Sequence, residues 1–94
     1  MRKSTHSPEY AALRERLAGL RREAGFTQRD LGQSLGVPHS WVAKVESGER
    51  RIDLVEFGWV CLACGASPSD EAAALLAQVA GPRRRPPARR GGRR

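Results

Sequence analysis

The segment TQRDLGQSLGVPHSWVAKVESGER, residues 27–50, predicts two short helices joined by a tight turn. Thr27 carries a hydroxyl that can cap the free backbone N–H groups of the first helix. Leu31 and Leu35 lie one turn apart and form the apolar edge of this helix. Gly36 is expected to end it, because glycine readily adopts the left-handed conformation found after many helices.

The second helix is expected over residues 38–47, since Pro38 fits the first turn of a helix, where its missing N–H is no loss. On a helical wheel, Val42 and Val45 form one apolar edge. The opposite face carries His39, Ser40, Ala43, Lys44 and Ser47. Short side chains beside a few longer donors suit a helix that enters the major groove of DNA, which is about 12 Å wide. An ordinary surface helix with a mildly polar face is the alternative.

The same segment resembles the helix-turn-helix of the Cro-type, or xenobiotic-response-element (XRE), family. The shared string is T-Q-x-x-L-G-x-x-L-G-V-P-x-S-x-V-x-K-x-E-S-G-E-R, preceded by A-G-F and followed by R-I-D-L-V-E-F. The resemblance covers the chain from about Leu13 to Cys64. It implies an all-α fold: a compact five-helix, repressor-like DNA-binding domain that contains a helix-turn-helix.

The resemblance also implies roles for individual residues on these two helices. Gln28 is expected to contact a phosphate and to brace the second helix. His39, Ser40 and Lys44 fall where the family reads base edges, and Ala43 is available for a thymine methyl group. His39 departs from the more common glutamine, and a neutral imidazole suits a single contact with a purine N7 or a phosphate.

Further phosphate contacts are expected from the end of the second helix and the loop after it. Ser47, Arg50 and Arg51 lie there, and a solvated basic turn is the alternative. Trp41 borders both the apolar edge and the polar face, so its ring is expected to pack inside while its N–H reaches a phosphate.

Glu46 resembles the family's glutamate that pairs with an arginine of the first helix of the domain, and Arg21 stands at the matching place. This structural ion pair is expected to fix the angle of a helix and not to touch DNA. If the pair is half buried, removing one partner would cost roughly 3 to 5 kcal/mol.

The first helix of the domain is expected to begin at Ser7-Pro8-Glu9, which supplies a hydroxyl cap and a proline for the first turn. Its apolar stripe consists of Tyr10, Leu13, Leu17, Leu20 and Ala24. The residues expected to be exposed are Arg14, Arg16, Arg22 and Glu23.

A fourth helix is expected over residues 53–64, with two apolar faces. The inward stripe is expected to be Leu54, Phe57, Cys61 and Cys64. Val55, Trp59 and Leu62 form a second apolar line. Gly58 lies in the middle, where glycine costs about 1 kcal/mol relative to alanine, so close packing against another backbone is expected.

The second apolar line needs a covering surface. One candidate is a fifth helix over residues 68–79, whose Leu75, Leu76 and Val79 also need to be covered. The other is a second copy of the protein, meeting through Trp59, since tryptophan is enriched at such contacts. The family commonly reads paired half-sites as dimers. A homodimer is therefore expected.

Cys61 and Cys64 form a C-x-x-C pair, but zinc needs about four ligands and neither His6 nor His39 is expected nearby. Both thiols are expected in the core, where they behave as small hydrophobic groups. No metal and no cofactor is predicted. Two reduced cysteines in a chain without a signal peptide suit the cytoplasm.

The net charge of +7 lies entirely in the tail, because residues 1–81 hold 10 basic and 10 acidic side chains. Residues 81–94 contain seven arginines without apolar periodicity, so a disordered tail is expected. Such a tail strengthens binding to any polyanion without choosing a sequence. A solvated tail without function is the alternative. The predicted organisation is thus a flexible N-terminus (1–7), a DNA-binding domain (8–80) and this tail.

Catalysis is not expected, because the chain shows no cluster of carboxylates, nucleophile with a base, or phosphate-binding glycine loop. No apolar run approaches the ~18 residues of a membrane span. Together with the resemblance, the sequence predicts a sequence-specific regulator that binds double-stranded DNA, acting as a dimeric repressor through residues 38–47. The alternatives are an antitoxin-like module that holds a protein partner such as a toxin, and a nonspecific nucleic-acid binder driven by the tail.

Overall fold

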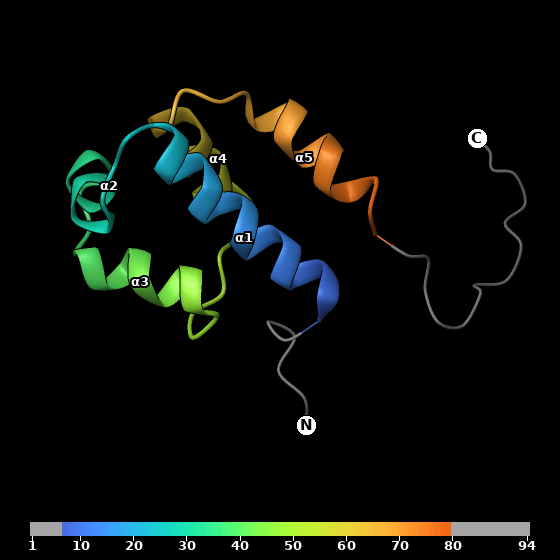
Figure 1. The fold of residues 1–94 in the computed structure, drawn as a ribbon, viewed down its shortest axis with the longest axis horizontal. Coiled ribbons are helices and arrows are strands. Elements are labelled where there is room, and N and C mark those ends of the chain that lie inside the picture. Colours follow the sequence, from blue (N-terminus) through green and yellow to red (C-terminus); the bar gives the residue numbers. More distant parts are fainter. Residues whose placement is uncertain (1–6, 80–94) are drawn as a thin grey trace, which may run out of the picture.

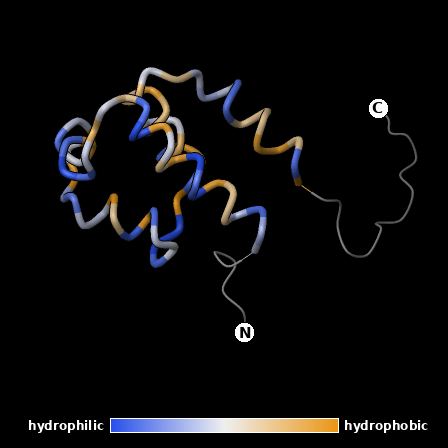
Figure 2. The backbone as a smooth tube through the Cα atoms, in the orientation of Figure 1, coloured by the Kyte–Doolittle hydropathy of each residue, from blue (hydrophilic) through white to orange (hydrophobic). Residues whose placement is uncertain are grey.

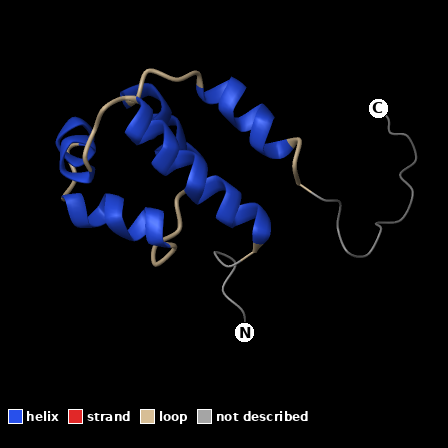
Figure 3. Ribbon diagram, in the orientation of Figure 1, coloured by secondary structure: helices blue, strands red, loops and turns tan. Residues whose placement is uncertain are grey.

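The computed structural model describes residues 7–79. This part of the chain folds into five helices joined by loops and contains no strand (Figure 1; Figure 3). They are α1 (Pro8–Glu23), α2 (Gln28–Leu35), α3 (His39–Ser47), α4 (Leu54–Ala63) and α5 (Pro68–Leu76). The expected all-α, five-helix fold is confirmed. The predicted flexible N-terminus, except Ser7, and the arginine-rich tail lie outside the described residues.

Local sequence explains where the helices begin. The Ser7 side chain accepts a hydrogen bond from the Tyr10 N–H, 3.0 Å away, and so caps α1 as predicted. Thr27 and Asp30 form a reciprocal capping box at the start of α2, and these bonds lower the pKa of the Asp30 carboxyl. Gly36 then ends α2 in the left-handed conformation, at φ 75°. Both predicted ends of the α2 segment are confirmed.

Two boundaries differ from the prediction. Pro38 is the N-cap of α3 and not part of its first turn, because its backbone stays extended at ψ 151° and the helix begins at His39. The last helix ends at Leu76 instead of Val79. Beyond Leu76 the N–H groups of Gln78 and Val79 bond to carbonyls three residues earlier, so the chain continues as turns.

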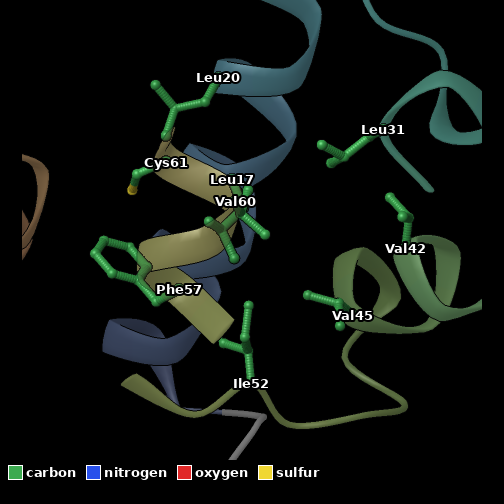
Figure 4. Packing of buried hydrophobic residues seen from close by; sticks show 9 residues of the cluster. All are labelled: Leu17, Leu20, Leu31, Val42, Val45, Ile52, Phe57, Val60 and Cys61. Carbon is green, nitrogen blue, oxygen red and sulfur yellow. The ribbon is translucent and has the colours of Figure 1, made fainter. Parts of the chain in front are cut away.

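The core lies where α1 and α4 meet α2 and α3 (Figure 4). Its members are Leu17, Leu20, Leu31, Val42, Val45, Ile52, Phe57, Val60 and Cys61. Leu17 and Leu20 belong to the predicted stripe of α1, and Val42 and Val45 to the predicted edge of α3. These packed side chains hold α3 in place from one side only.

The face of α4 differs from the prediction at two residues. Leu54 was expected in the inward stripe, but it is the first residue of α4 and its side chain is 80% exposed. Gly58 was expected to meet another backbone, but a Cβ built there would have nothing within 4 Å among the described residues. Phe57 and Cys61 are buried as predicted, and Val60 is buried with them.

α5 packs loosely over α1 and α4. Figure 2 shows hydrophobic residues along much of α5, yet Leu76 is 67% exposed and only Ala72 and Leu75 of this helix pack against the core. An ion pair supplies a further tie, since Arg16 donates to both carboxylate oxygens of Glu71, at 2.7 and 3.0 Å. Arg16, predicted as exposed, is therefore half-buried.

This tie predicts a pH-dependent contribution to stability. The bonds from Arg16 hold the pKa of Glu71 below its ordinary value of 4.5, so the pair stabilises the fold above that pH and the contribution is lost as the pH falls through the lowered pKa. We expect Glu71→Gln to lower the free energy of unfolding at neutral pH by up to about 1 kcal/mol, since the pair is partly exposed.

Urea unfolding of the wild type and Glu71→Gln at neutral and acidic pH measures this effect. The difference in the free energy of unfolding between the two proteins should become smaller at acidic pH. Glu15→Gln, at an exposed carboxylate of α1 that forms no ion pair within residues 7–79, is the matched control and should show no such pH dependence. An equal effect of both substitutions at every pH would contradict the prediction.

Candidate nucleic-acid interface

The polar face of α3 points away from the core. Val42 and Val45 are 2% and 3% exposed, and they anchor α3 against α1 and α2. On the other side, four of the five predicted side chains are exposed: His39, Ser40, Lys44 and Ser47. Ala43 is half-buried between the two sides. The result is a helix face of small and polar groups with a single cation, Lys44.

Gly32 sets how closely α2 approaches the start of α3. A Cβ at Gly32 would lie 2.8 Å from the Val37 carbonyl oxygen and 3.2 Å from both the Cα and the nitrogen of His39. The Gly32 carbonyl accepts a hydrogen bond from the Val37 N–H, 2.9 Å away. Gly32 was not among the residues predicted from the sequence to have a role. A glycine inside an otherwise regular helix is the signal that indicates such close packing.

Arg21, Glu46 and Gln28 form a polar network behind α3. Arg21 Nε donates to Glu46 Oε2 at 2.7 Å, and Arg21 Nη2 donates to Glu46 Oε1 at 3.2 Å. Gln28 Nε2 donates to the same Glu46 Oε1 at 3.0 Å, while Arg21 Nη1 reaches the Phe26 carbonyl at 2.8 Å. The side chains of Arg21 and Glu46 are only 12% and 11% exposed. The network therefore ties the last turn of α3 to α1 and to the first residue of α2.

Arg14 contacts the end of α3 and is half-buried, although it was expected to be exposed. Its Nη1 donates to the Glu46 carbonyl at 3.1 Å, and its Nε is buried without a hydrogen bond to the described residues. Gly48 follows at φ 86°, and a Cβ there would lie 3.1 Å from Arg14 Nε. A cation at this place also complements the negative end of the α3 dipole.

Arg50 and Arg51, predicted together, have different surroundings in the structure. Arg50 Nη2 lies 3.0 Å from Glu56 Oε2, and its guanidinium lies over the Trp41 ring, 5.0 Å from the centroid. Hydrogen bonding to Arg50 lowers the pKa of the Glu56 carboxyl. Arg51 is exposed and lies 5.7 Å from the centroid of the Tyr10 ring.

The loop that carries both arginines is also held by Tyr10. The Tyr10 hydroxyl accepts a hydrogen bond from the Ile52 N–H at 2.9 Å, and the Ile52 side chain lies in the core. At the other end of the loop, the Arg50 N–H donates to the Lys44 carbonyl at 3.1 Å. The loop after α3 is therefore tied to α1, to α3 and, through Glu56, to α4.

A separate apolar surface lies on α4. Val55, Trp59 and Leu62 are 61%, 54% and 66% exposed. Beside Trp59 lies an open groove of about 460 Å³, which Ser34, Leu35, Leu62 and Ala63 line with it. We call Val55, Gly58, Trp59 and Leu62 the outer surface of α4.

The two cysteines are free thiols on the inner side of α4. Cys61 is buried, and burial raises its pKa to about 11; burial also raises the pKa of the half-buried Cys64. Thiols with raised pKa values are poor nucleophiles at neutral pH. Within residues 7–79, His, Cys, Asp and Glu side chains form no group of three that could hold a metal ion.

No helix in the described part of the chain is long and apolar enough to cross a membrane.

Comparison with known proteins matches this chain to a family model and to solved structures. A family model described as a helix-turn-helix domain matches residues 12–75. A solved structure, an XRE-family like protein from Pseudomonas syringae pv. tomato, is 38% identical and superposes with a TM-score of 0.74. That match covers 82% of this chain and 94% of the other. The comparison with curated proteins gives no match.

Proposed function

Since the chain belongs to the XRE-type helix-turn-helix family, we propose that it is a sequence-specific, DNA-binding transcriptional regulator. Both matches support a DNA-binding regulator. The finer proposal is a repressor that acts as a dimer in the cytoplasm: each copy inserts α3 into a major groove, and the bound dimer blocks the polymerase. This function requires no chemistry and no cofactor, and domains of this kind are typically non-enzymatic.

The observation that carries the proposal is the pairing of an exposed polar face on α3 with rigid support behind it. The side chains of His39, Ser40 and Lys44 form no hydrogen bonds with other described residues, so their donors and acceptors are available to base edges. Ala43 adds a methyl group for contact with thymine. Meanwhile the largely buried side chain of Glu46 is held by Arg21 and Gln28.

Phosphate contacts are proposed for groups around this face. Arg51 is exposed and forms no ion pair within the described residues, and Gln28 is half-buried with its amide already bracing Glu46. Ser47 is exposed at the end of α3, where its hydroxyl donates to the Lys44 carbonyl at 3.2 Å. The indole N–H of the half-buried Trp41 is a further candidate. Such contacts fix the register of α3 on the duplex.

Lys44→Ala tests base reading by α3. Lysine can donate to O6 and N7 of guanine, so we expect the substitution to relax the choice at one base pair at a cost of roughly 1 to 3 kcal/mol. Binding to duplexes that vary at each position measures this. Arg51→Ala is the matched control, since loss of a phosphate contact should weaken all sequences alike. Uniform weakening by Lys44→Ala would refute a base-reading role.

Dimerisation is proposed through the outer surface of α4. This surface carries no charge and includes Gly58, where an added Cβ would meet no atom of the described residues within 4 Å. Residues 1–6 and 80–94 contain only Met1, Ala80 and Ala88 as hydrophobic side chains, so these two segments offer little to cover it. Two copies meeting at this surface would cover each other with matching apolar groups.

Trp59→Ser is expected to shift the sedimentation coefficient toward that of a monomer, because tryptophans at the centre of an interface carry much of the binding energy. Leu76→Ser, at an exposed leucine on α5, is the matched control and should leave the coefficient unchanged. If Trp59→Ser has the sedimentation coefficient of the wild type, Trp59 is not part of the dimer interface.

The same surface favours a second candidate function, in which α4 holds a different protein, as in an antitoxin. A small protein that co-purifies with the wild type but not with Trp59→Ser would support it.

The tail offers a third candidate, nonspecific binding of nucleic acid. Removal of residues 81–94 separates this from the main proposal, because a specific reader keeps its preferred site while a tail-driven binder loses most of its affinity.

A further inference from the structure

Arg50 lies in the loop between α3 and α4, and its guanidinium already has partners within the chain. Nη1 donates to Glu56 Oε1 at 3.1 Å and to the Arg51 carbonyl at 2.6 Å, while Nη2 donates to Glu56 Oε2 at 3.0 Å. One face of the guanidinium lies over the Trp41 ring. Three of the five guanidinium N–H groups are therefore bonded, and the pairing with Glu56 is bidentate.

The carboxylate that Arg50 binds also belongs to the first turn of α4. Glu56 Oε1 accepts a hydrogen bond from the Asp53 N–H at 3.0 Å, and Asp53 Oδ1 accepts one from the Glu56 N–H at 2.7 Å. The Glu56 side chain is 14% exposed. A shift of Arg50 would therefore disturb the start of α4.

On its other side Arg50 reaches α3 itself. Trp41 follows Ser40 and precedes Lys44 by three residues, so its ring is fixed to the same helix that carries the exposed polar face. α3 packs mainly against α2 and α1. Through Trp41 and Glu56, Arg50 thus forms a polar link between α3 and α4.

We infer that Arg50 is a positioning residue, which sets the angle of α3 relative to α4 through Trp41 and Glu56 and does not bind a phosphate. The inference rests on the proposed function and replaces the expectation from the sequence that Arg50 contacts DNA. A phosphate that drew the Arg50 guanidinium toward the DNA would lengthen its bonds to Glu56. The Glu56 carboxylate, 14% exposed, would then lack its cation and lie close to a polyanion, which is unfavourable. Arg51, exposed and without an ion pair among the described residues, is the phosphate ligand of this loop.

The neighbouring arginines form a matched pair for the first test. Binding of the full chain to its selected duplex is measured against salt concentration. Arg51→Gln should reduce the salt slope by about 0.9, the loss of one phosphate contact. Arg50→Gln should weaken binding about tenfold with an unchanged slope. Arg50→Lys should bind as weakly, because an ammonium cannot form the bidentate, stacked arrangement. A slope reduced by Arg50→Gln and restored by Arg50→Lys would overturn the inference.

Glu56→Gln separates the two roles by the sign of its effect. If Arg50 positions α3, loss of the Glu56 charge weakens DNA binding. If Arg50 is a phosphate ligand, the substitution frees it and removes a negative charge, so binding tightens and the inference fails. Glu49→Gln, at an exposed carboxylate on the same loop, is the charge-matched control and should not weaken binding.

NMR spectra of the protein without DNA directly test the link that Arg50 forms between α3 and α4. Arg50→Lys should shift the backbone amide signals of α3 as far as Ser40, while circular dichroism shows the wild-type helix content. Shifts confined to the loop around residue 50 would overturn the inference. This result is independent of DNA binding, whereas a wild-type protein that selects no duplex would refute the proposed function instead.

Discussion

Glu46→Ala is expected to lower the free energy of unfolding by about 3 kcal/mol, the low end of the range for breaking a buried ion pair. The substitution leaves the Arg21 guanidinium largely buried and without its carboxylate, and it also removes the acceptor of the Gln28 amide. Removing one partner costs more than the pair itself contributes, because the remaining charge loses both its solvent and its partner. DNA binding should fall as well, since α3 loses the side-chain tie to Arg21 of α1.

Urea unfolding followed by far-UV circular dichroism measures the change. Glu49→Ala is the matched control: Glu49 follows α3 closely but is exposed, so its loss should change stability by less than about 0.5 kcal/mol. Glu46→Gln should fall between the two, because an amide keeps some hydrogen bonds but not the charge. A loss with Glu46→Ala no larger than with Glu49→Ala would contradict the description of this network as a buried support.

Gly32→Ala is the second change with a large expected effect. The added methyl group would collide with backbone atoms of Val37 and His39, which cannot rotate away, so the start of α3 must move. Overpacking of this kind costs typically 1 to 3 kcal/mol, and we expect about 3 because the contact is with backbone. DNA binding should decrease further than stability alone explains, since His39 begins α3.

Gly19→Ala is the control for this experiment. Gly19 also lies inside a helix, but a Cβ there would be 3.8 Å or more from any other side chain, in ordinary contact. Alanine should therefore stabilise α1 by about 0.5 to 1 kcal/mol through its higher helix propensity. Thermal unfolding of the two variants should shift in opposite directions. Stabilisation by both would show that α2 and α3 are not held as closely as the structure describes.

The sequence predicted those features that depend on neighbouring residues. Ser7, Thr27 and Gly36 act on backbone groups within a few residues, so their capping roles could be identified from local spacing. The apolar edge of α3 could be predicted because the spacing of Val42 and Val45 places them on one side of the helix. Both are buried in the structure. The all-α fold and the family followed from the motif and are confirmed.

What the sequence missed depends on contacts between distant elements. Periodicity could not place Leu54, because it shares a side with Phe57 and Cys61, and only the packing shows that this side is left exposed at the first residue of α4. The bond from Arg14 to the Glu46 carbonyl spans 32 residues, and long polar side chains of this kind carry no periodic signal. Arg50 was grouped with Arg51 by charge, whereas the structure separates them by their partners.

The most direct test of the central claim, that α3 reads a DNA sequence, is selection of bound sites from a random duplex library at about 150 mM salt. The full-length wild type and Lys44→Ala are compared. We predict a palindromic motif with half-sites about one helical turn apart, and loss of preference at one base pair of each half-site in the variant. No enriched motif, or an identical motif from both proteins, would contradict the account of α3 as the element that reads DNA through Lys44.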